Sequence, residues 1–465
     1  MTKREKLVRF LVERYESRTP RSREAFARAE KVMVRGGSHT LRLFRPYPFF
    51  VRKAQGATVE DLDGGTYIDY WQGHYANVLG HNPPELAAEV ERLAGRNGPL
   101  HTGFESEFQV LLAERLLERL GWKGHKVRFT TSGTLAAMSA VLLAQGFTGR
   151  EKILKVAGGW HGASPMLLKG VKYGPGGYEH LESAGLPERT LRNTLLVKFN
   201  DLDDLERVVR KAGDKAACFI VEPFLGAGGF LPATSDYLAA ARRLCDRHGI
   251  VLIFDEIVSG FRFGPAGVQT LYGVEPDLAA FGKVIGGGHA VAAVTGKRFL
   301  LDCCETKAPA ARRVLFEGGT FSSHPQYMKA GLAMLNVLSR RSKTIYPRLG
   351  AMGEALRRGV EKAFAVQGFR VQCTGDPDPL LGGSSMFMVN FPKDSAGLRS
   401  AEDVADPARC DVALKEDVLK LALMTMGVHV VHGGGAVSAA HQTSDIDRTL
   451  EAYAEAARLF KSYLF

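Results

Sequence analysis

The sequence predicts an α/β protein with a mainly parallel β-sheet in a large domain and a second, smaller α/β domain. From about residue 104, short apolar stretches alternate with helical patterns, which is the order typical of a parallel sheet. A chain of 465 residues is also too long for one simple core. The alternation is lost toward both ends, so we predict that residues 1–95 and 338–465 together form the smaller domain and residues 96–337 the larger one.

The N-terminal region is predicted to contain helices followed by short strands. Apolar residues recur at helical spacing over residues 3–34, with Pro20 as an interruption, which predicts one or two surface helices. Three strand-like pieces follow, with the sequences PFFVRKAQG, ATVEDLDGG and TYIDYW. The Asp-Gly-Gly tract at residues 63–65 predicts a hairpin turn between the last two pieces. A Pro-Pro pair then opens the helix ELAAEVERLAG.

Five short apolar stretches predict strands of the large sheet, and each is flanked by a helical pattern or a turn. The predicted strands are Lys126–Thr130, Lys152–Val156, Thr194–Lys198, Cys218–Val221 and Ile250–Phe254. Ligands in open α/β sheets bind at the carboxyl ends of the strands. Polar residues that directly follow these strands are therefore the first candidates for a functional site.

The last of these strands is followed by two carboxylates and, further on, by a lysine in an unusual setting. Asp255 and Glu256 directly follow the predicted end of the strand at Phe254, and Lys283 lies between apolar and glycine residues in FGKVIGGG. Desolvation lowers the pKa of an amine and makes it a better nucleophile. The alternative is a surface lysine between a strand and a turn. The combination of Lys283 with Asp255 favours a functional role.

The stretch IFDEIVSGFR followed by DLAAFGKVIGGG resembles the cofactor signature of class III, fold type I, pyridoxal-phosphate (PLP) aminotransferases. The most similar subgroup is the one that contains glutamate-1-semialdehyde aminomutase. The resemblance implies a seven-stranded-type sheet, a Schiff base between PLP and Lys283, and a pairing of Asp255 with the pyridinium nitrogen. An acid beside this nitrogen keeps it protonated, so that the ring can act as an electron sink. The lysine serves as nucleophile and then as proton carrier.

A helix start that follows the first predicted strand matches the phosphate-binding turn of this family. Ser132, Gly133 and Thr134 precede the helical run LAAMSAVLLAQGF. Backbone N–H groups and the helix dipole at such a position suit a phosphate. The alternative is a simple N-cap. The chain departs from the family at Leu135, where glutamate is usual, but the N–H groups do not depend on that side chain.

Four further residues match family positions around the cofactor ring. Trp160 stands where an aromatic residue, usually tyrosine, stacks on the pyridine ring, and His161 follows it. Ile257 is expected to contact the opposite ring face. Glu222, at the end of FIVE, matches an acid near the cofactor. The alternatives are a partly buried core tryptophan at position 160 and a structural ion pair for Glu222.

A glycine-rich segment near residue 320 predicts a homodimer. GGTFS matches the phosphate-contacting segment of the family, in which the threonine reaches across a dimer interface. By this resemblance Thr320 contributes to the site of a partner subunit, so we expect two shared active sites. A hydroxyl group in a loop is otherwise unremarkable.

The match is weakest where the substrate is expected. Arg42 lies where the aminomutase subgroup keeps an arginine that binds the substrate carboxylate, although a solvated loop arginine is the alternative. His74 replaces an aromatic residue of the subgroup. Residues 431–435, VHGGG, replace a longer segment with a serine, a phenylalanine and a glutamate, and Ala290 replaces a proline. These changes leave the PLP residues intact and alter the substrate pocket, which argues against a true aminomutase.

Bulk properties exclude several other classes. The formal charge is +11, but basic and acidic residues are interleaved and no basic run alternates with aromatics, so we expect no nucleic-acid binding. The sequence contains no stretch of about twenty apolar residues, so we predict no membrane span. We expect no metal site and reduced thiols in a cytoplasmic protein, because the cysteines lack zinc-like spacing. The six cysteines are Cys218, Cys245, Cys303, Cys304, Cys373 and Cys410.

The sequence therefore predicts a PLP-dependent aminotransferase that moves an amino group from an amino acid or amine to a keto acid. β-Amino acids are candidate donors by analogy with related enzymes. The alternative is an intramolecular aminomutase that acts on glutamate-1-semialdehyde or a similar compound. A nucleotide-binding dehydrogenase would need a GxGxxG turn after an early strand, which we do not find.

Overall fold

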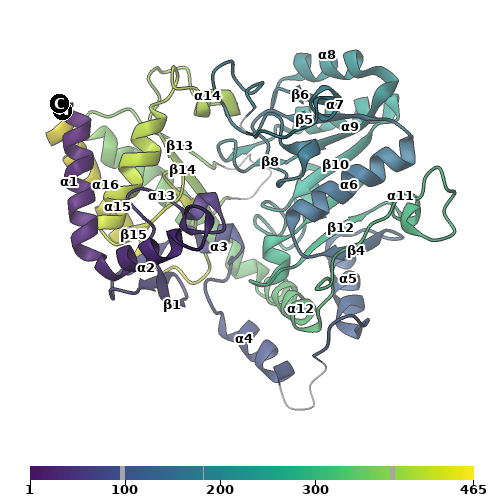
Figure 1. Cartoon of the computed structure of the whole chain (residues 1–465), viewed down its shortest axis with the longest axis horizontal. Helices are drawn as coiled ribbons and strands as arrows, with labels where there is room; N and C mark the ends of the chain where they lie inside the picture. Colours follow the sequence, from purple (N-terminus) through teal and green to yellow (C-terminus); the bar gives the residue numbers. More distant parts are fainter. Residues whose placement is uncertain (95–99, 182, 377–382) are drawn as a thin grey trace.

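A large α/β unit lies beside a smaller unit in which both chain termini come together (Figure 1). The computed structural model describes residues 1–94, 100–181, 183–376 and 383–465. The amine of Lys3 donates a 2.6 Å hydrogen bond to the carbonyl oxygen of Phe465, so the first helix and the last residue are in direct contact.

The large unit contains a seven-stranded sheet that is mainly parallel, as predicted. In spatial order its strands are β4 (Lys126–Thr130), β12 (Ala292–Gly296), β11 (Leu278–Phe281), β10 (Val251–Glu256), β7 (Ala216–Val221), β5 (Lys152–Val156) and β6 (Thr194–Val197). β12 runs antiparallel to both of its neighbours, and the other pairs are parallel. The five predicted strands are present. β11 and β12 were not predicted, because their alanine-rich sequences carry little strand propensity.

The predicted end of β10 was wrong by two residues. β10 continues through both carboxylates, and Asp255 and Glu256 pair with Ala280 and Phe281 of β11. The sequence interpretation ended the strand at Phe254 because charged residues usually mark the surface. Here both carboxylates are buried, and Glu256 accepts hydrogen bonds from the N–H groups of Val268 (2.6 Å) and Gln269 (3.3 Å).

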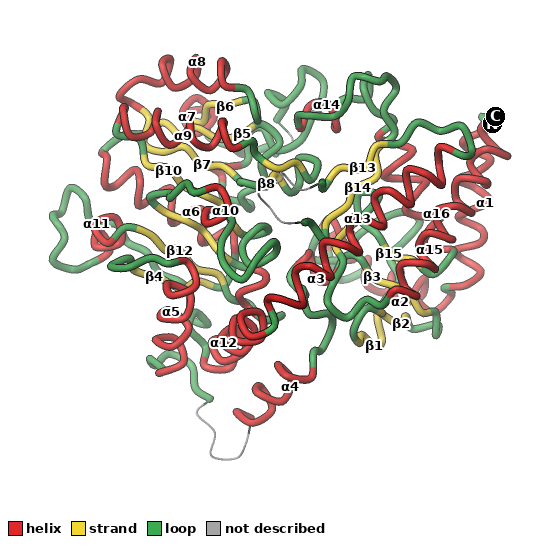
Figure 2. Tube along the Cα trace, turned by 180° about the vertical axis from the view of Figure 1, so that it is seen from behind, coloured by secondary structure: helices red, strands yellow, loops and turns green. Residues whose placement is uncertain are grey.

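Helices cover both faces of this sheet (Figure 2). Alternate strand residues point to opposite faces, so Cys218 and Ile220 pack in one apolar cluster while Phe219 and Val221 pack in another. The first cluster contains the alanine-rich face of α6. The helices of this unit are α5 (Glu107–Leu120), α6 (Gly133–Thr148), α7 (Glu188–Asn193), α8 (Leu202–Ala212), α9 (Ser235–His248), α10 (Gln269–Tyr272), α11 (Arg298–Leu301) and α12 (Pro325–Arg340). β8 (Phe224–Leu225) and β9 (Leu231–Pro232) form a small separate hairpin.

The smaller unit joins N- and C-terminal strands in one sheet. Its order is β1 (Val51–Gln55), β2 (Thr58–Asp61), β3 (Thr66–Asp69) and β15 (Val428–His429), with β15 parallel to β3. A second sheet contains β13 (Gln372–Thr374), β14 (Met386–Asn390) and β16 (Gly435–Ala436). The helices outside the large unit are α1 (Lys3–Arg18), α2 (Pro20–Glu30), α3 (Gln72–Tyr75), α4 (Pro84–Glu91), α13 (Ser342–Ala365), α14 (Ala401–Ala405), α15 (Lys420–Thr425) and α16 (Thr443–Leu464). The predicted boundary between residues 95 and 96 lies outside the described residues, and the boundary between 337 and 338 stays a prediction.

The predicted hairpin turn between β2 and β3 is present. Gly64 has a φ of 86°, which favours glycine, and the Asp61 carboxylate accepts hydrogen bonds from the N–H groups of Asp63 (2.9 Å) and Gly65 (2.7 Å). Throughout the residues that the structure describes, no helix is both long and apolar enough to cross a membrane.

Candidate active site

A cavity of about 260 Å³ lies at the carboxyl ends of the large sheet's strands. It is lined by segments that follow β4, β5, β7, β10 and β11, which parallel strand direction brings to one edge. We call it the cofactor cavity. The predicted site residues in its wall are His74, Ser132, Gly133, Thr134, Trp160, His161, Glu222, Asp255, Ile257 and Lys283.

One end of the cofactor cavity is the N-terminus of α6. The hydroxyl of Ser132 caps the helix by accepting a 3.3 Å hydrogen bond from the N–H of Leu135, as the N-cap alternative predicted. The N–H groups of the first helical turn have no intrahelical acceptor and remain available to an anion. Thr134 supports the facing loop, because its Oγ1 accepts a 3.3 Å hydrogen bond from the N–H of Ala163. The Ser132 cap and backbone N–H groups available to an anion therefore coexist in one turn.

Another part of the cavity wall is built around Asp255. Its Oδ2 lies 2.8 Å from Nδ1 of His161, and its Oδ1 accepts a 3.0 Å hydrogen bond from the N–H of Ile257. Burial lowers the pKa of His161, although the charge of Asp255 opposes this shift. A carboxylate only accepts hydrogen bonds, so Nδ1 of the histidine donates and fixes the orientation of the acid. His161 thus contacts Asp255 directly, a contact that the sequence did not specify.

Glu222 holds the loop that carries Trp160. Its carboxylate accepts hydrogen bonds from the N–H groups of Trp160 (2.9 Å) and Gly226 (2.9 Å), and it pairs with no basic side chain in the described part of the chain. The ion-pair alternative was therefore wrong. Burial and, second, the negative charge of Asp255 raise the pKa of Glu222. Trp160 itself is 42% exposed and lines the cofactor cavity.

Lys283 follows β11 at the start of the short helical turn Lys283–Gly286. Its φ is 46°, in the left-handed region that costs a residue with a side chain about 1–3 kcal/mol. Burial lowers the pKa of its amine, while Asp255 and Glu222 oppose this shift. No residue that the structure describes accepts a hydrogen bond from Nζ. The cavity therefore contains a strained lysine whose amine is available to a ligand.

The two predicted substrate residues contact each other. Nε of Arg42 donates a 3.3 Å hydrogen bond to Nε2 of His74. Burial, with smaller contributions from the nearby His39 and Arg42, lowers the pKa of His74 to about 3, so the ring is neutral and can accept. The ring centroids of His39 and His74 lie 4.5 Å apart. His74 also lines a second cavity, and Arg42 lies in the wall of that cavity only.

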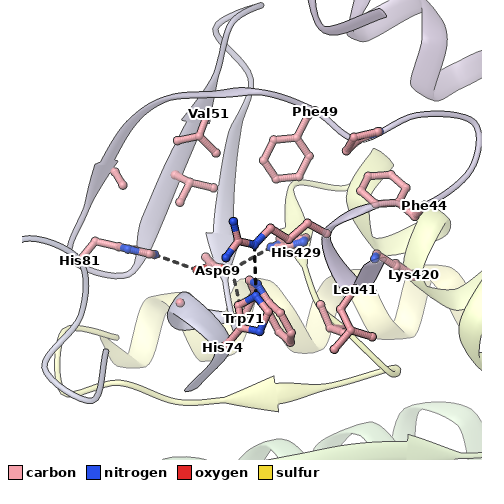
Figure 3. Close-up of a pocket in the computed structure, with 16 residues that line it drawn as sticks. Leu41, Phe44, Phe49, Val51, Asp69, Trp71, His74, His81, Lys420 and His429 are labelled. Atoms are coloured by element: carbon pink, nitrogen blue, oxygen red, sulfur yellow. Dashed lines mark hydrogen bonds and ion pairs between the residues drawn. The ribbon is translucent and has the colours of Figure 1, made fainter. Parts of the chain in front are cut away.

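This second cavity, of about 320 Å³, contains residues that sequence reasoning missed (Figure 3). We call it the anion cavity, because it contains two cationic side chains, Arg42 and Lys420. Its floor includes Asp69, whose two carboxylate oxygens lie 2.8 Å from ring nitrogens of His81 and His429. Asp69 ends β3, whereas the predicted strand TYIDYW continued past it, so the rule applied to Asp255 did not single it out. His429 is 360 residues away from Asp69 in sequence, so no spacing could reveal their contact.

Thr320 is exposed and lines neither cavity. The sequence placed it at the site of a partner subunit, which a single chain does not test.

Comparison with known proteins identifies the family. The family description "Aminotransferase class-III" matches residues 42–368. The chain belongs to the class-III aminotransferase family. A glutamate-1-semialdehyde 2,1-aminomutase from Methanosphaera stadtmanae is 35% identical over 438 residues, which cover 93% of this chain and 97% of that protein.

Solved structures of the same family agree with this assignment. A transaminase with PLP bound superposes with a TM-score of 0.83 at 31% identity, covering 96% of this chain and 99% of the other. A β-phenylalanine aminotransferase from Variovorax paradoxus superposes with a TM-score of 0.82 at 27% identity, covering 97% and 96%. The predicted fold type I architecture and the predicted cofactor, PLP, are confirmed.

The cofactor cavity fits PLP. Its wall contains free backbone N–H groups at the start of α6 for a phosphate, a buried carboxylate at Asp255 for a ring nitrogen, and an unpaired amine at Lys283. A Cβ on Gly133 would lie only 3.1 Å from the side chain of Ile257, so glycine keeps this wall open.

Proposed function

We propose that this class-III PLP enzyme is an aminotransferase that moves an amino group from an amino acid, β-amino acids included, or an amine to a keto acid. The observation that carries the proposal is the anion cavity beside His74. At its edge, residues 431–435 form a tight turn in which Val431 and Gly434 exchange backbone hydrogen bonds of 2.9 and 3.2 Å. This turn takes the place of the serine, phenylalanine and glutamate of the aminomutase pattern, so the chain has a different substrate pocket beside an intact cofactor cavity.

Each residue of the cofactor cavity has a distinct role in the proposed reaction. PLP supplies an electron sink that stabilises negative charge at the substrate carbon next to the nitrogen. Lys283 binds the cofactor and, when released, moves the proton to and from that carbon. Asp255, oriented by His161, keeps the ring nitrogen protonated. Trp160 and Ile257, which line the same cavity, would contact the two faces of the ring.

Ser132, Gly133 and Thr134 hold the phosphate at the start of α6, and Glu222 fixes the loop of Trp160. We further propose that the enzyme is a homodimer in which Thr320 completes the phosphate site of the partner. The exposure of this segment supports the proposal, since Phe321 beside Thr320 is 59% exposed. A cytoplasmic location stays a prediction.

A second candidate function is intramolecular amino transfer within glutamate-1-semialdehyde. It is favoured by the 35% identity to a protein named as that aminomutase.

Omitting each substrate in turn separates the two functions. An aminotransferase forms product only when an amino donor and a keto acid acceptor are both present. An aminomutase converts glutamate-1-semialdehyde with no second substrate. Product formation from donor plus acceptor, and from neither alone, supports our proposal; rapid isomerisation of glutamate-1-semialdehyde alone contradicts it.

A further inference from the structure

The anion cavity has apolar walls and two cationic groups. Figure 3 shows Lys420 beside Phe44 and Leu41 on one side of the cavity, with His81 on the opposite side. The apolar walls come from the segment before β1, from β1 and β2, and from Trp71. A cavity of about 320 Å³ is within the size range of small-molecule sites.

Lys420 is a buried amine with no hydrogen-bond or ion-pair partner among the described residues. Burial lowers its pKa to about 8, and the negative charge of Glu416 opposes this shift. The residue is only 8% exposed, and its Nζ lies 4.3 Å from the centroid of the Phe44 ring. Among the residues that the structure describes, none accepts a hydrogen bond from this amine or pairs with it as a carboxylate. A ring face attracts a cation but cannot accept its three N–H donors as a carboxylate does. An ammonium group buried in this way is expected to bind an acceptor that enters the cavity.

The nearby carboxylates are already occupied. Glu416, one turn before Lys420, lies 3.0 Å from Nδ1 of His432 and 3.6 Å from the amine of Lys415. Lys415 in turn donates a 3.2 Å hydrogen bond to Asn390. Asp69 uses both of its oxygens for the two histidines of the cavity floor. Lys420 is therefore the member of this charged group that is left for a ligand.

Lys420 directly follows a π-helix, which is an uncommon type of helix. Residues Leu414–Leu419 form a π-helix, and Lys420 is the first residue of α15. A π-helical turn shifts the angular position of the residues that follow it, and such turns are frequent at functional sites. Here the π-helix ends directly before Lys420, which lines the anion cavity.

We propose, on the basis of the aminotransferase function above, that Lys420 binds the second carboxylate of a small dicarboxylic substrate, an amino acid or keto acid. Arg42 binds the first carboxylate with the guanidinium nitrogens that its contact to His74 leaves free. The apolar walls enclose the carbon chain between the two charges. Lys420 is thus a specificity residue that selects diacids over monoacids.

Binding of glutarate, compared with butyrate, tests this proposal on the purified holoenzyme. Glutarate carries two carboxylates and butyrate one, and neither has an amino group, so the result does not depend on whether amino transfer occurs. We expect glutarate to bind at least about tenfold more tightly than butyrate by calorimetry, since a hydrogen bond to a charged group contributes on that scale. Equal affinities for the two acids would overturn the proposal.

Substitutions then assign the effect to Lys420. Lys420→Met keeps the length of the side chain, and we expect it to weaken glutarate binding at least about tenfold, to the level of butyrate. Lys420→Arg should retain the preference for glutarate. Lys53→Met is the matched control, because it removes the same charge from an exposed position on β1 and should leave glutarate binding within about twofold of the native value.

Native glutarate affinity in Lys420→Met would overturn the proposal. If that variant does not fold, Lys420→Arg together with the glutarate and butyrate comparison decides it. Loss of the diacid preference in Lys420→Arg would then count against the proposal. Failure of amino transfer with intact, Lys420-dependent glutarate binding would overturn the proposed function and leave the assignment of Lys420 standing.

Discussion

The cofactor cavity and the anion cavity share His74 but are built in opposite ways. In the cofactor cavity, the carboxylates of Asp255 and Glu222 are each held by two hydrogen bonds, and one amine, that of Lys283, is left unpaired. In the anion cavity the carboxylate of Asp69 is held by two histidines, and Arg42 and Lys420 have no carboxylate partner among the described residues. The first arrangement suits a permanently bound cofactor with one reactive contact. The second suits an anionic molecule that binds and leaves.

The largest effect is expected from Lys283→Ala. This change removes the unpaired amine of the cofactor cavity, so we expect turnover to fall by at least about 10³-fold and the visible absorbance of lysine-bound PLP to disappear. Lys198→Ala, at an exposed lysine after β6, is the control and should change neither. Retained turnover in Lys283→Ala would show that the cofactor cavity is not the catalytic site.

Asp255→Asn compared with Glu256→Gln tests which of two adjacent buried carboxylates acts on the cofactor. Asp255 lines the cavity, whereas Glu256 binds backbone N–H groups outside it, and burial raises its pKa to about 7. We expect Asp255→Asn to lower kcat by about 10²- to 10³-fold through loss of the charge. Glu256→Gln should affect the melting temperature more than kcat in the folded enzyme. Equal losses of kcat would contradict the assignment of Asp255.

Arg42→Ala tests whether Arg42 binds the substrate carboxylate. Loss of a charge-assisted hydrogen bond to a carboxylate is expected to raise KM for carboxylate substrates by about tenfold or more, with a smaller effect on kcat. Steady-state kinetics with the keto acid acceptor measures this. Arg45→Ala, at an exposed arginine three residues further on, serves as control. A fall in kcat at unchanged KM would place Arg42 on the cofactor side instead.

The smallest effect is expected from Gly133→Ala. The added Cβ would lie 3.1 Å from the side chain of Ile257, which must give way by a few tenths of an ångström. We expect PLP to bind about three- to tenfold more weakly, which corresponds to ~1 kcal/mol of overpacking. Titration of the apoenzyme with PLP measures this. Recovery of affinity in the double variant Gly133→Ala, Ile257→Val would identify the steric cause, and unchanged PLP affinity in the single variant would contradict it.

The sequence predicted the cofactor cavity more fully than the anion cavity, for a physical reason. The cofactor residues follow apolar strands of a parallel sheet, so strand direction alone brings Ser132, Glu222 and Asp255 to one edge. The sequence also predicted the turn at Gly64 and the first helices. It missed the alanine-rich strands β11 and β12. These segments form strands because they are buried beneath helices and pair with neighbouring strands, which their own residues do not reveal.

Beyond Arg42 and His74, which the sequence singled out as substrate residues, the anion cavity could not be predicted because its residues meet only in the folded chain. Arg42 comes from the N-terminal segment and Lys420 from α15. The π-helix directly before Lys420 sets the position of the lysine, and no residue pattern in the sequence predicts such a helix. The contact between Asp69 and His429 likewise depends on the parallel pairing of β3 with β15.

The most direct measurement of the central claim is the visible spectrum of the purified holoenzyme during addition of amino donors without an acceptor. Our account predicts that one class, α-amino acids, β-amino acids or simple amines, converts the yellow lysine-bound form of the cofactor to its pyridoxamine form. One equivalent of carbonyl product should then be released per site. If no donor does so, and glutamate-1-semialdehyde alone is isomerised, the enzyme is an aminomutase and the altered anion cavity does not define its reaction.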